Sequence, residues 1–230
     1  DRDIEETGSK IRSPATLQRW MAAYGAATAT ATTYSKIAGA ANPGVREQPS
    51  RTTLATYREA LERLFVLDAR PAWLPSTAHL NELGATPKHH LADPALAVAL
   101  LGLDADALLA GDDRAAAAFR DGPFLGALFE SLVTLSVRVY AQRSEASVAH
   151  FRTHRGEREV DLIVERRDGR CLGIEVKLSP VVSDDDVRHL VWLRDRLGAE
   201  LLDAVVVTTG AHAYRRADGI AVVPAALLGP

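Results

Sequence analysis

The stretch EVDLIVERRDGRCLGIEVK, residues 159–177, decides how the second half of this chain folds. Two runs of alternating apolar and charged residues flank Asp168 and Gly169, a pair that is typical of β-hairpin turns. A two-residue turn would mix apolar and charged side chains on both faces of the hairpin. A three-residue turn, with Gly169 in the left-handed conformation, keeps the apolar residues together on one face, and we expect this register.

That register gathers charged side chains on the other face. It sets Asp161 directly opposite Glu175, with Glu159 and Lys177 beside them. Facing carboxylates repel each other, and Lys177 offsets only part of that repulsion. A divalent cation such as Mg²⁺ would offset more, because its ligands in proteins are oxygens. The hairpin therefore has two interpretations: a cation site, or the solvated face of an ordinary sheet.

The elements around the hairpin indicate an α/β order. The helix that precedes it is apolar nearly all round, which predicts burial, and Glu130 is the only ionisable residue between Phe124 and Val137. Glu130 either points toward the same acids or is a partly exposed glutamate at the helix edge. The apolar run at 204–207 predicts a central strand that is covered on both faces. The expected elements are a helix at 123–142, a strand at 148–153, the hairpin at 159–177, a helix at 183–198, and strands at 203–210 and 219–224.

Three helices are expected in the first half of the chain. Ser13 and Ser50 are N-cap residues for the first and third of them, and residues 32–42 fit a short second helix. An extended segment with several prolines follows, so the order is that of a winged helix-turn-helix. The apolar face predicted for the third helix consists of Leu54, Tyr57, Leu61, Leu64 and Phe65.

The exposed face of the third helix holds the candidates for phosphate contacts. They are Arg51, Thr52, Thr53 and Arg58. Contacts of this kind would make nucleic-acid binding salt-dependent. The alternative interpretation is a solvated helix face without a partner.

The chain divides into three expected parts: a helical winged-helix-like domain at 1–75, a connecting segment at 76–120, and an α/β domain with a central mixed sheet at 121–230. The connecting segment contains His89, His90 and Asp93. Neighbouring side chains of a strand point to opposite faces, so the two histidines do not share a metal ion. Asp93 instead precedes Pro94 as the cap of another helix.

Composition sets wider limits. The 230 residues are 47% apolar and carry a net charge of −3, with +5 over residues 7–90 and −5 over residues 91–230. Cys171 is the only cysteine, which excludes a disulfide framework and a CxxC zinc site. The most apolar stretch, at 90–110, is interrupted by aspartates and a proline and cannot span a bilayer. We expect a cytoplasmic protein without a membrane partner.

The acids and the lysine together resemble a nuclease motif. The order Glu130, Asp161, then Glu175-Val176-Lys177 is similar to that of the PD-(D/E)XK nuclease superfamily. The resemblance implies Mg²⁺ or Mn²⁺ bound by Asp161, Glu175 and the Val176 carbonyl, with Glu130 contributing through water. It also implies that Lys177 orients or deprotonates the water that attacks a phosphodiester of DNA or RNA.

A second resemblance covers most of residues 12–228. The segments GALFESLV, HFRTHRGEREVDLIVER, GIEVKLS and GIAVVPAALL are similar to domain of unknown function 4143, the C-terminal region of a prokaryotic ATPase family. TTLATYREALERLFVLDARPAW and PKHHLADPALAVALLG are similar to the winged-helix linker of the same proteins.

Members of that family usually begin with a P-loop ATPase domain, but this chain has no GxxxxGK[ST] motif and therefore no ATP site. Either the ATPase domain was removed or it was never present. We expect a truncated member whose partner is the missing ATPase domain.

Two functions are compatible with these patterns. The first is a metal-dependent nuclease with a nucleic-acid-binding winged helix. The second is a non-catalytic nuclease-like module that couples an ATPase to a protein or nucleic acid.

Overall fold

The computed structural model describes residues 13–42, 50–74, 84, 86–111, 119 and 123–229. The chain forms two compact units. Unit 1 consists of Asp1–Ala69 and Lys88–Ser131, and unit 2 consists of Arg70–Pro87 and Leu132–Pro230. Each unit therefore joins segments that are distant in the sequence. The domain ranges expected from the sequence group the residues differently and stay a prediction.

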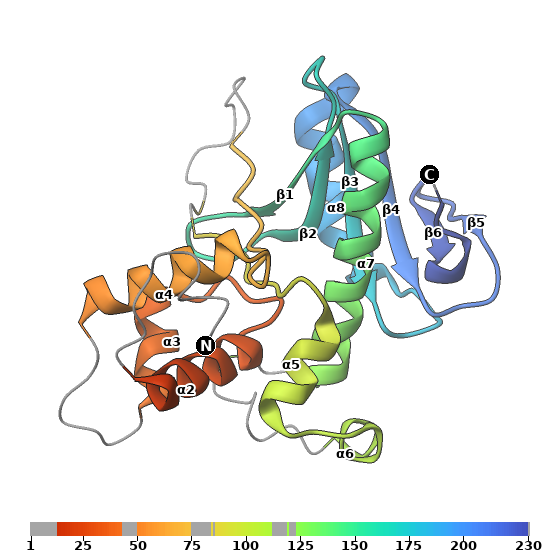
Figure 1. Cartoon of the computed structure of the whole chain (residues 1–230). Coiled ribbons are helices and arrows are strands. Elements are labelled where there is room, and N and C mark those ends of the chain that lie inside the picture. The colour runs from red at the N-terminus through yellow and green to blue at the C-terminus, as the bar shows by residue number, and fades with distance from the viewer. Residues whose placement is uncertain are drawn as a thin grey trace. The chain divides into compact units, whose positions relative to one another are not determined.

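Helices come first along the chain and the sheet follows, as expected for an α+β protein (Figure 1). The helices are α2 (Pro14–Ala26), α3 (Tyr34–Ala41), α4 (Arg51–Arg63), α5 (Pro94–Leu101), α6 (Ala105–Ala110), α7 (Phe124–Arg143) and α8 (Asp184–Leu197), with short 3₁₀ turns η2 (Gly198–Glu200) and η3 (Ala225–Leu227). The strands are β1 (Ser147–Arg152), β2 (Glu159–Glu165), β3 (Cys171–Lys177), β4 (Leu201–Thr208), β5 (Tyr214–Arg215) and β6 (Ala221–Pro224).

The predicted helix starts in unit 1 are confirmed by their caps. The Ser13 hydroxyl accepts a hydrogen bond from the Thr16 amide, and the Ser50 hydroxyl accepts one from the Thr53 amide. Each cap satisfies an amide that has no partner within its helix. The helices enclose one apolar core that includes Leu17, Trp20, Tyr24, Ile37, Tyr57 and Leu61.

Three short extended segments complete unit 1. The backbone of His89 exchanges hydrogen bonds with Ala29 (2.7 Å) and Thr30 (2.9 Å) on one side. On the other side, the Asp68 amide donates to the His90 carbonyl and the Ala92 amide donates to the Val66 carbonyl. Residues 89–92 therefore lie between residues 29–30 and residues 66–68.

The two adjacent histidines point to different surroundings. His89 Nε2 lies 2.8 Å from the Thr32 carbonyl, and the His89 ring packs edge-on against Tyr24 and Tyr34. His90 Nδ1 lies 3.2 Å from the Ser131 hydroxyl. Burial lowers the pKa of His89, so it remains neutral at neutral pH. The expectation that they do not share a metal ion is consistent with these contacts.

Phe65 does not belong to the apolar face of α4, and that part of the prediction is wrong. The helix ends at Arg63, and Phe65 follows in the left-handed region with φ = 55°. The Val66 amide then donates to the Leu61 carbonyl and closes the helix end. Because the chain turns at this point, the Phe65 ring is directed into solvent and is 82% exposed.

Unit 2 is built on a mixed six-stranded sheet in the order β1-β2-β3-β4-β6-β5. The pairs β1–β2, β2–β3 and β5–β6 are antiparallel, and β3–β4 and β4–β6 are parallel. The apolar strand β4 has a partner on each side, as the run at 204–207 predicted. The sequence did not predict β5, because it has only two residues.

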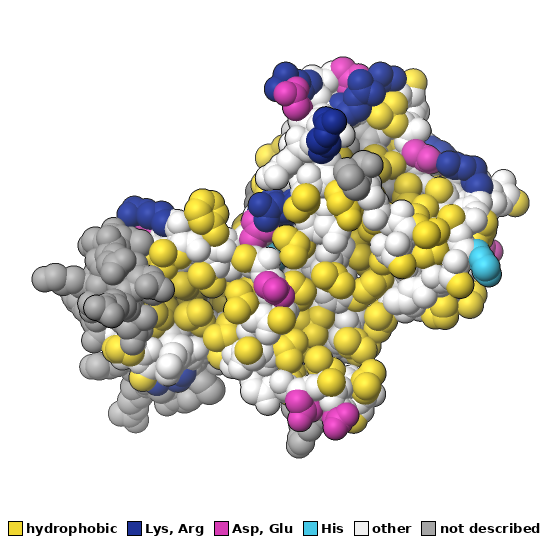
Figure 2. Space-filling view, turned by 45° about the vertical axis from the view of Figure 1, so that its right-hand side comes forward, with side chains coloured by type: hydrophobic (Ala, Val, Ile, Leu, Met, Phe, Trp, Pro, Cys, Tyr) yellow, Lys and Arg dark blue, Asp and Glu magenta, His cyan; other side chains and the backbone are white. Residues whose placement is uncertain are grey.

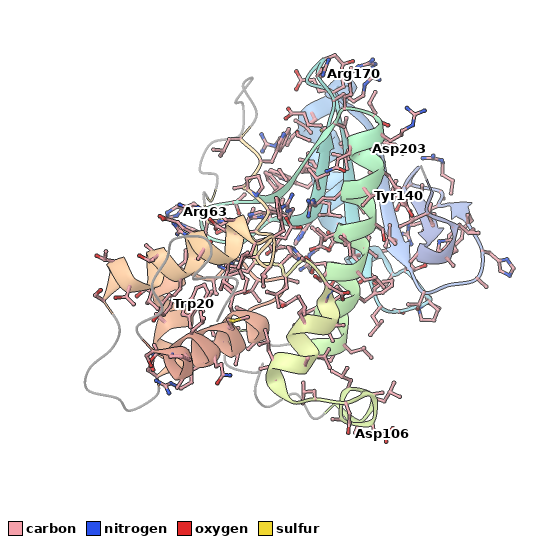
Figure 3. The ribbon with its side chains drawn as sticks, in the orientation of Figure 1. Trp20, Arg63, Asp106, Tyr140, Arg170 and Asp203 are labelled. Atoms are coloured by element: carbon pink, nitrogen blue, oxygen red, sulfur yellow. The ribbon has the colours of Figure 1, made fainter. Side chains whose placement is uncertain are left out.

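The helix α8 connects the parallel strands β3 and β4 and packs against both, and the second half of α7 lies on the opposite face of the sheet (Figure 1). Gly173 of β3 allows α8 to approach closely, since a Cβ there would lie 3.3 Å from the Leu190 side chain. Tyr140, labelled on α7 in Figure 3, donates to the Leu228 carbonyl.

Burial of α7 is one-sided, which corrects the expectation of a helix buried all round. Val133 and Val137 are buried, whereas Leu132 and Val139 are exposed. Among the described helices, α7 alone is long and apolar enough to cross a membrane by length and composition. Core helices of soluble proteins can have the same length and composition, and less than half of the most apolar part of α7 is buried.

The outer edge of β1 is paired with a segment from earlier in the chain. The Trp73 amide donates to the His150 carbonyl (2.7 Å), and the His150 amide donates to the Pro71 carbonyl (3.0 Å). Farther along, the Gly84 amide donates to the Arg152 carbonyl. The outer edge of β1 is thus hydrogen-bonded at His150 and at Arg152.

Candidate acidic site on the central sheet

The β2–β3 hairpin has the register that the three-residue turn predicted. Its pairs run from Glu165 opposite Cys171 to Leu162 opposite Ile174. The Arg166 amide donates to the Arg170 carbonyl, and Gly169 has φ = 80°, in the left-handed region. Arg170 marks the tip of this hairpin in Figure 3. The regular pairing ends at Leu162 and Ile174, one position before Asp161 and Glu175.

Arginines and acids form ion pairs at the tip of the hairpin. Arg166 and Arg170 both pair with Asp168, and Arg167 pairs with Glu145. Figure 2 shows dark blue and magenta side chains together at the top of the view, the end at which Figure 3 labels Arg170. Each of the three arginines therefore lies beside one of two acids, Asp168 or Glu145, in an exposed cluster of ion pairs.

Asp161 lies at an irregularity of strand β2. The strand β1 pairs Ala149 with Ile163 and Phe151 with Val160, so Asp161 and Leu162 together face the single residue His150. Two residues opposite one define a β-bulge, which redirects side chains and interrupts regular pairing. The Asp161 carboxylate accepts a hydrogen bond from the Val176 amide at 2.9 Å. The Asp161 side chain therefore accepts a hydrogen bond from β3 at the point where the regular pairing between β2 and β3 ends.

Glu175 and Lys177 form the other half of the site. Lys177 Nζ lies 3.0 Å from a Glu175 carboxylate oxygen and 3.9 Å from an Asp186 oxygen. Asp161 and Glu175 are each 8% exposed, whereas Lys177 is about one-third exposed. Burial of two acids beside one lysine raises the strength of their interactions, because little water screens them.

The charge of Lys177 is set by these acids. Burial alone would lower the pKa of Lys177, but Glu175, Asp161 and Asp186 outweigh burial and the pKa is raised. Lys177 is therefore an ammonium ion at neutral pH. For Asp186, burial alone would raise the pKa, but hydrogen bonds from Ser183 and the charge of Lys177 outweigh burial and the pKa is lowered.

Two residues of α8 complete the surroundings of the site, and the sequence analysis missed both. Asp186 belongs to the capping box with Ser183 and also approaches Lys177. His189 lies one helical turn later, with Nδ1 2.7 Å from the Glu159 carbonyl. The topology offered a signal: α8 begins directly after β3, so its first turns flank the end of the strand that carries Glu175 and Lys177.

His189 is neutral at neutral pH. Burial lowers its pKa, and the positive charges of Arg188, Arg158 and Lys177 lower it further, against the hydrogen bond to the Glu159 carbonyl. Arg188 Nε donates to His189 Nε2 at 3.0 Å, which leaves the proton on Nδ1. His189 thus fixes the first residue of β2 two positions before Asp161.

Glu130 lies in unit 1, whereas Asp161 and Glu175 lie in unit 2. Its carboxylate is 2.9 Å from Nζ of Lys88, a lysine that is 1% exposed. A buried lysine accounts for the glutamate in an apolar helix. Participation of Glu130 in a metal site stays a prediction.

The donor atoms of the candidate site are of the type that a hard cation binds. Asp161, Glu175 and the Val176 carbonyl supply only oxygen, the ligand type of Mg²⁺ and Mn²⁺. Within the described ranges, no three side chains of His, Cys, Asp or Glu converge as a metal site. The two carboxylates would therefore need the backbone carbonyl and water to complete the coordination.

The candidates on α4 have mixed surroundings. Thr52 is exposed, and the Thr53 hydroxyl lies 2.9 Å from the Ser50 hydroxyl at the cap. The Arg58 guanidinium stacks over the Tyr34 ring at 4.9 Å and lies 3.6 Å from Glu62. The Arg51 side chain lies outside the described part of the structure. A role of these four residues in binding nucleic acid stays a prediction.

Comparisons with known proteins match the two halves separately. The family called Domain of unknown function (DUF4143) matches residues 125–228, which confirms the resemblance to that domain. A second family, Domain of unknown function (DUF8612), matches residues 1–107. Each match covers less than half of the chain. No curated protein matches.

Among solved structures, a chain in a half-complex of Thermococcus gammatolerans McrB AAA+ hexamers with bound McrC is similar to this protein. The alignment covers 90% of this chain and 70% of that chain. The sequence identity is 12% and the TM-score is 0.33. Similarity at this level carries no conclusion about the fold or function of this protein.

Proposed function

We propose that unit 2 is a metal-dependent nuclease of the PD-(D/E)XK type, which hydrolyses phosphodiester bonds in DNA or RNA. The observation that carries this proposal is the grouping of Asp161, Glu175 and Lys177 on two neighbouring strands. Two largely buried acids lie beside a lysine that is partly open to solvent. Buried like charges destabilise a fold, so such a group is more typical of a site than of a scaffold.

Each residue has a role that follows from its position. Asp161 and Glu175 would hold Mg²⁺ or Mn²⁺ together with the Val176 carbonyl. The cation supplies Lewis-acid stabilisation of charge on the phosphate. Lys177 orients the attacking water, a role that fits its ion pair with Glu175 better than proton abstraction does. His189 holds the backbone of Glu159 and thereby the start of the strand that carries Asp161.

Unit 1 is proposed to be a winged-helix module that binds nucleic acid. The support is the order of its elements: α2, an extended segment at 29–30, α3, α4, and extended segments at 66–68 and 89–92. The segment at 89–92 lies between the other two, as in a small wing. The third helix, α4, would be the recognition helix, with Thr52 on its exposed side.

An ATPase domain is the proposed partner. The support is the resemblance of residues 125–228 to DUF4143, a domain that usually follows a P-loop ATPase. This part of the proposal is independent of catalysis.

The test is cleavage of labelled single- and double-stranded DNA and RNA by the chain, with Mg²⁺, with Mn²⁺ and with EDTA. The variants Glu175→Ala and Lys177→Ala remove the site, and Glu165→Ala is the matched control on β2, outside the site. Metal-dependent cleavage by the parent and by Glu165→Ala, but by neither site variant, is expected. Cleavage that persists in both site variants would contradict the proposal.

A second candidate is a non-catalytic module that couples an ATPase to its partners. One observation favours it: Asp161 and Glu175 already have partners within the protein, the Val176 amide and Lys177. Absence of cleavage by the parent, also after an ATPase domain is supplied, would select this candidate.

A further inference from the structure

The helix α8 carries a partly buried aromatic residue, Trp192, that is flanked by arginines. The guanidinium of Arg158 lies 5.8 Å from the centre of the Trp192 ring, and that of Arg196 lies 5.5 Å from it. Trp192 in turn packs against Phe151, at 5.8 Å between ring centres. The arginines come from different elements, since Arg158 precedes β2 and Arg196 is near the end of α8.

These two arginines differ from their neighbours in how their charge is matched. Arg188 pairs with Asp185, Arg194 lies near Asp195, and Arg152 lies near Glu159. Within the described part of the chain, no carboxylate lies within 4.0 Å of the charged nitrogens of Arg158 or Arg196. Stacking on Trp192 orients both guanidinium groups without neutralising them.

Arg158 is close to Asp161 in the sequence, and Arg196 belongs to the helix that also carries Asp186 and His189. Arg158 is three residues before Asp161, roughly 10 Å along an extended strand. On α8, residues 186 and 196 are separated by about 15 Å, and His189 lies between them. The charges of Lys177 and Arg158 both act on His189, since each of them lowers the pKa of its imidazole.

We infer that Arg158 and Arg196, held by Trp192, bind the phosphodiester backbone of a nucleic acid and lead it toward Asp161 and Glu175. This inference rests on the proposed function, since it assigns the grip on the substrate to unit 2 itself. Guanidinium groups bind phosphate through paired hydrogen bonds, and the exposed Arg155 adds a third positive charge at the same end of β2. The negative net charge of the second half therefore does not prevent unit 2 from binding a polyanion.

The test measures equilibrium binding of fluorescent single- and double-stranded DNA to the full chain in EDTA, where metal-dependent cleavage does not occur. The double variant Arg158→Ala/Arg196→Ala is compared with Arg166→Ala/Arg167→Ala, which removes two hairpin arginines that have acid partners. Both variants change the net charge equally. Circular dichroism and melting curves establish that both are folded.

We expect the Arg158/Arg196 variant to bind about tenfold more weakly at low salt, whereas the hairpin variant binds nearly as the parent does. The slope of log Kd against log salt should fall by about 1.4 to 1.8, the release expected for two phosphate contacts. Arg158→Lys/Arg196→Lys should recover part of the affinity, because it keeps the charge but loses the planar donor pair.

Equal weakening in both alanine variants, or none in either, would overturn the inference, as would absence of DNA binding by the parent. The same titration is carried out with polyglutamate. Weaker polyglutamate binding by the Arg158/Arg196 variant, with unchanged DNA binding, would identify an acidic protein as the partner and also overturn the inference. The cleavage proposal fails separately: DNA binding that depends on Arg158 and Arg196, without cleavage, supports this inference and contradicts the nuclease.

Discussion

In the described part of the protein, the lysine–glutamate pairs Lys88–Glu130 and Lys177–Glu175 have nearly equal lengths but very different surroundings. Lys88 and Glu130 in unit 1 are 2.9 Å apart, and Lys177 and Glu175 in unit 2 are 3.0 Å apart. The side chain of Lys88 is 1% exposed, whereas that of Lys177 is 31% exposed. The lysine of the pair is shielded from solvent in unit 1, whereas the lysine of the pair in unit 2 reaches solvent.

The difference shows why an ion pair alone does not identify a site. A pair that is closed at the lysine end leaves no room for a reactant, and it contributes to the integrity of its unit. The pair in unit 2 has a second buried acid, Asp161, within interaction range of its lysine, and a lysine that reaches solvent. The second acid and the open lysine together distinguish the candidate site.

The largest difference is expected for activity. Lys177→Met should lower the rate of metal-dependent cleavage by about 10²- to 10⁴-fold, the range for loss of a group that acts on the reacting water. Lys88→Met should leave the rate per folded molecule unchanged, as measured by single-turnover cleavage below its melting temperature. Equal losses in the two variants would remove the functional distinction between the pairs.

Stability should fall in both variants. Lys88→Met leaves Glu130 in an apolar setting without this lysine, and should lower the free energy of unfolding by about 3 kcal/mol. Lys177→Met leaves the buried carboxylates of Asp161 and Glu175 without the ammonium ion beside them, and should lower it by a similar amount, about 3 kcal/mol. Urea denaturation of the full chain measures both values, and an unchanged midpoint in either variant would contradict this prediction.

The register of the acidic site depends on Gly169, with a smaller expected effect. Gly169→Ala places a side chain in the left-handed region and should destabilise unit 2 by about 1 kcal/mol. Gly169→Asn should be tolerated better, because asparagine adopts this conformation more readily. Thermal melts of the two variants check this, and equal melting temperatures would show that the turn does not require φ > 0.

The smallest effect is the pH dependence of unit 1. The pKa of His89 is lowered from 6.5 by burial, so below pH 6.5 the unfolded chain binds a proton that the folded unit does not. The contribution of His89 to stability is therefore complete above pH 6.5 and declines as the pH falls toward its lowered pKa. His189 acts in the same direction in unit 2.

Urea midpoints between pH 7.5 and 5 should accordingly fall less in His89→Gln than in the parent. His212→Gln, at an exposed residue, is the control and should follow the parent. A steeper decline in His89→Gln would mean that the imidazole gains a proton on folding.

Local signals predicted much of the fold. Helices begin directly after Ser13, Ser50 and Ser183. The hydroxyl of each serine accepts a hydrogen bond from an amide of the first turn, which has no carbonyl partner within the helix. Gly169 indicated the hairpin register, and the observed pairs from Glu165 opposite Cys171 to Leu162 opposite Ile174 confirm it. Each of these features depends on residues that are close together in the sequence.

Features that depend on distant partners were not predictable in the same way. Glu130 lies beside Lys88, which is 42 residues away. His189 contacts the backbone of Glu159, which is 30 residues away in the sequence. The local pattern of residues in α8 gave no indication of this contact. Phe65 was misplaced because the pattern of apolar residues continues past the point where the helix ends.

The pairing of β1 with residues 71–73 also limits how copies of this protein interact. An open strand edge offers a row of amides and carbonyls to any other extended chain, and it is a common start of aggregation. On one edge of this sheet the His150 amide and carbonyl are already bonded to Pro71 and Trp73, and on the other edge β5 has two residues. Neither edge offers a long template, so growth of fibres by strand addition is disfavoured from both ends of the sheet.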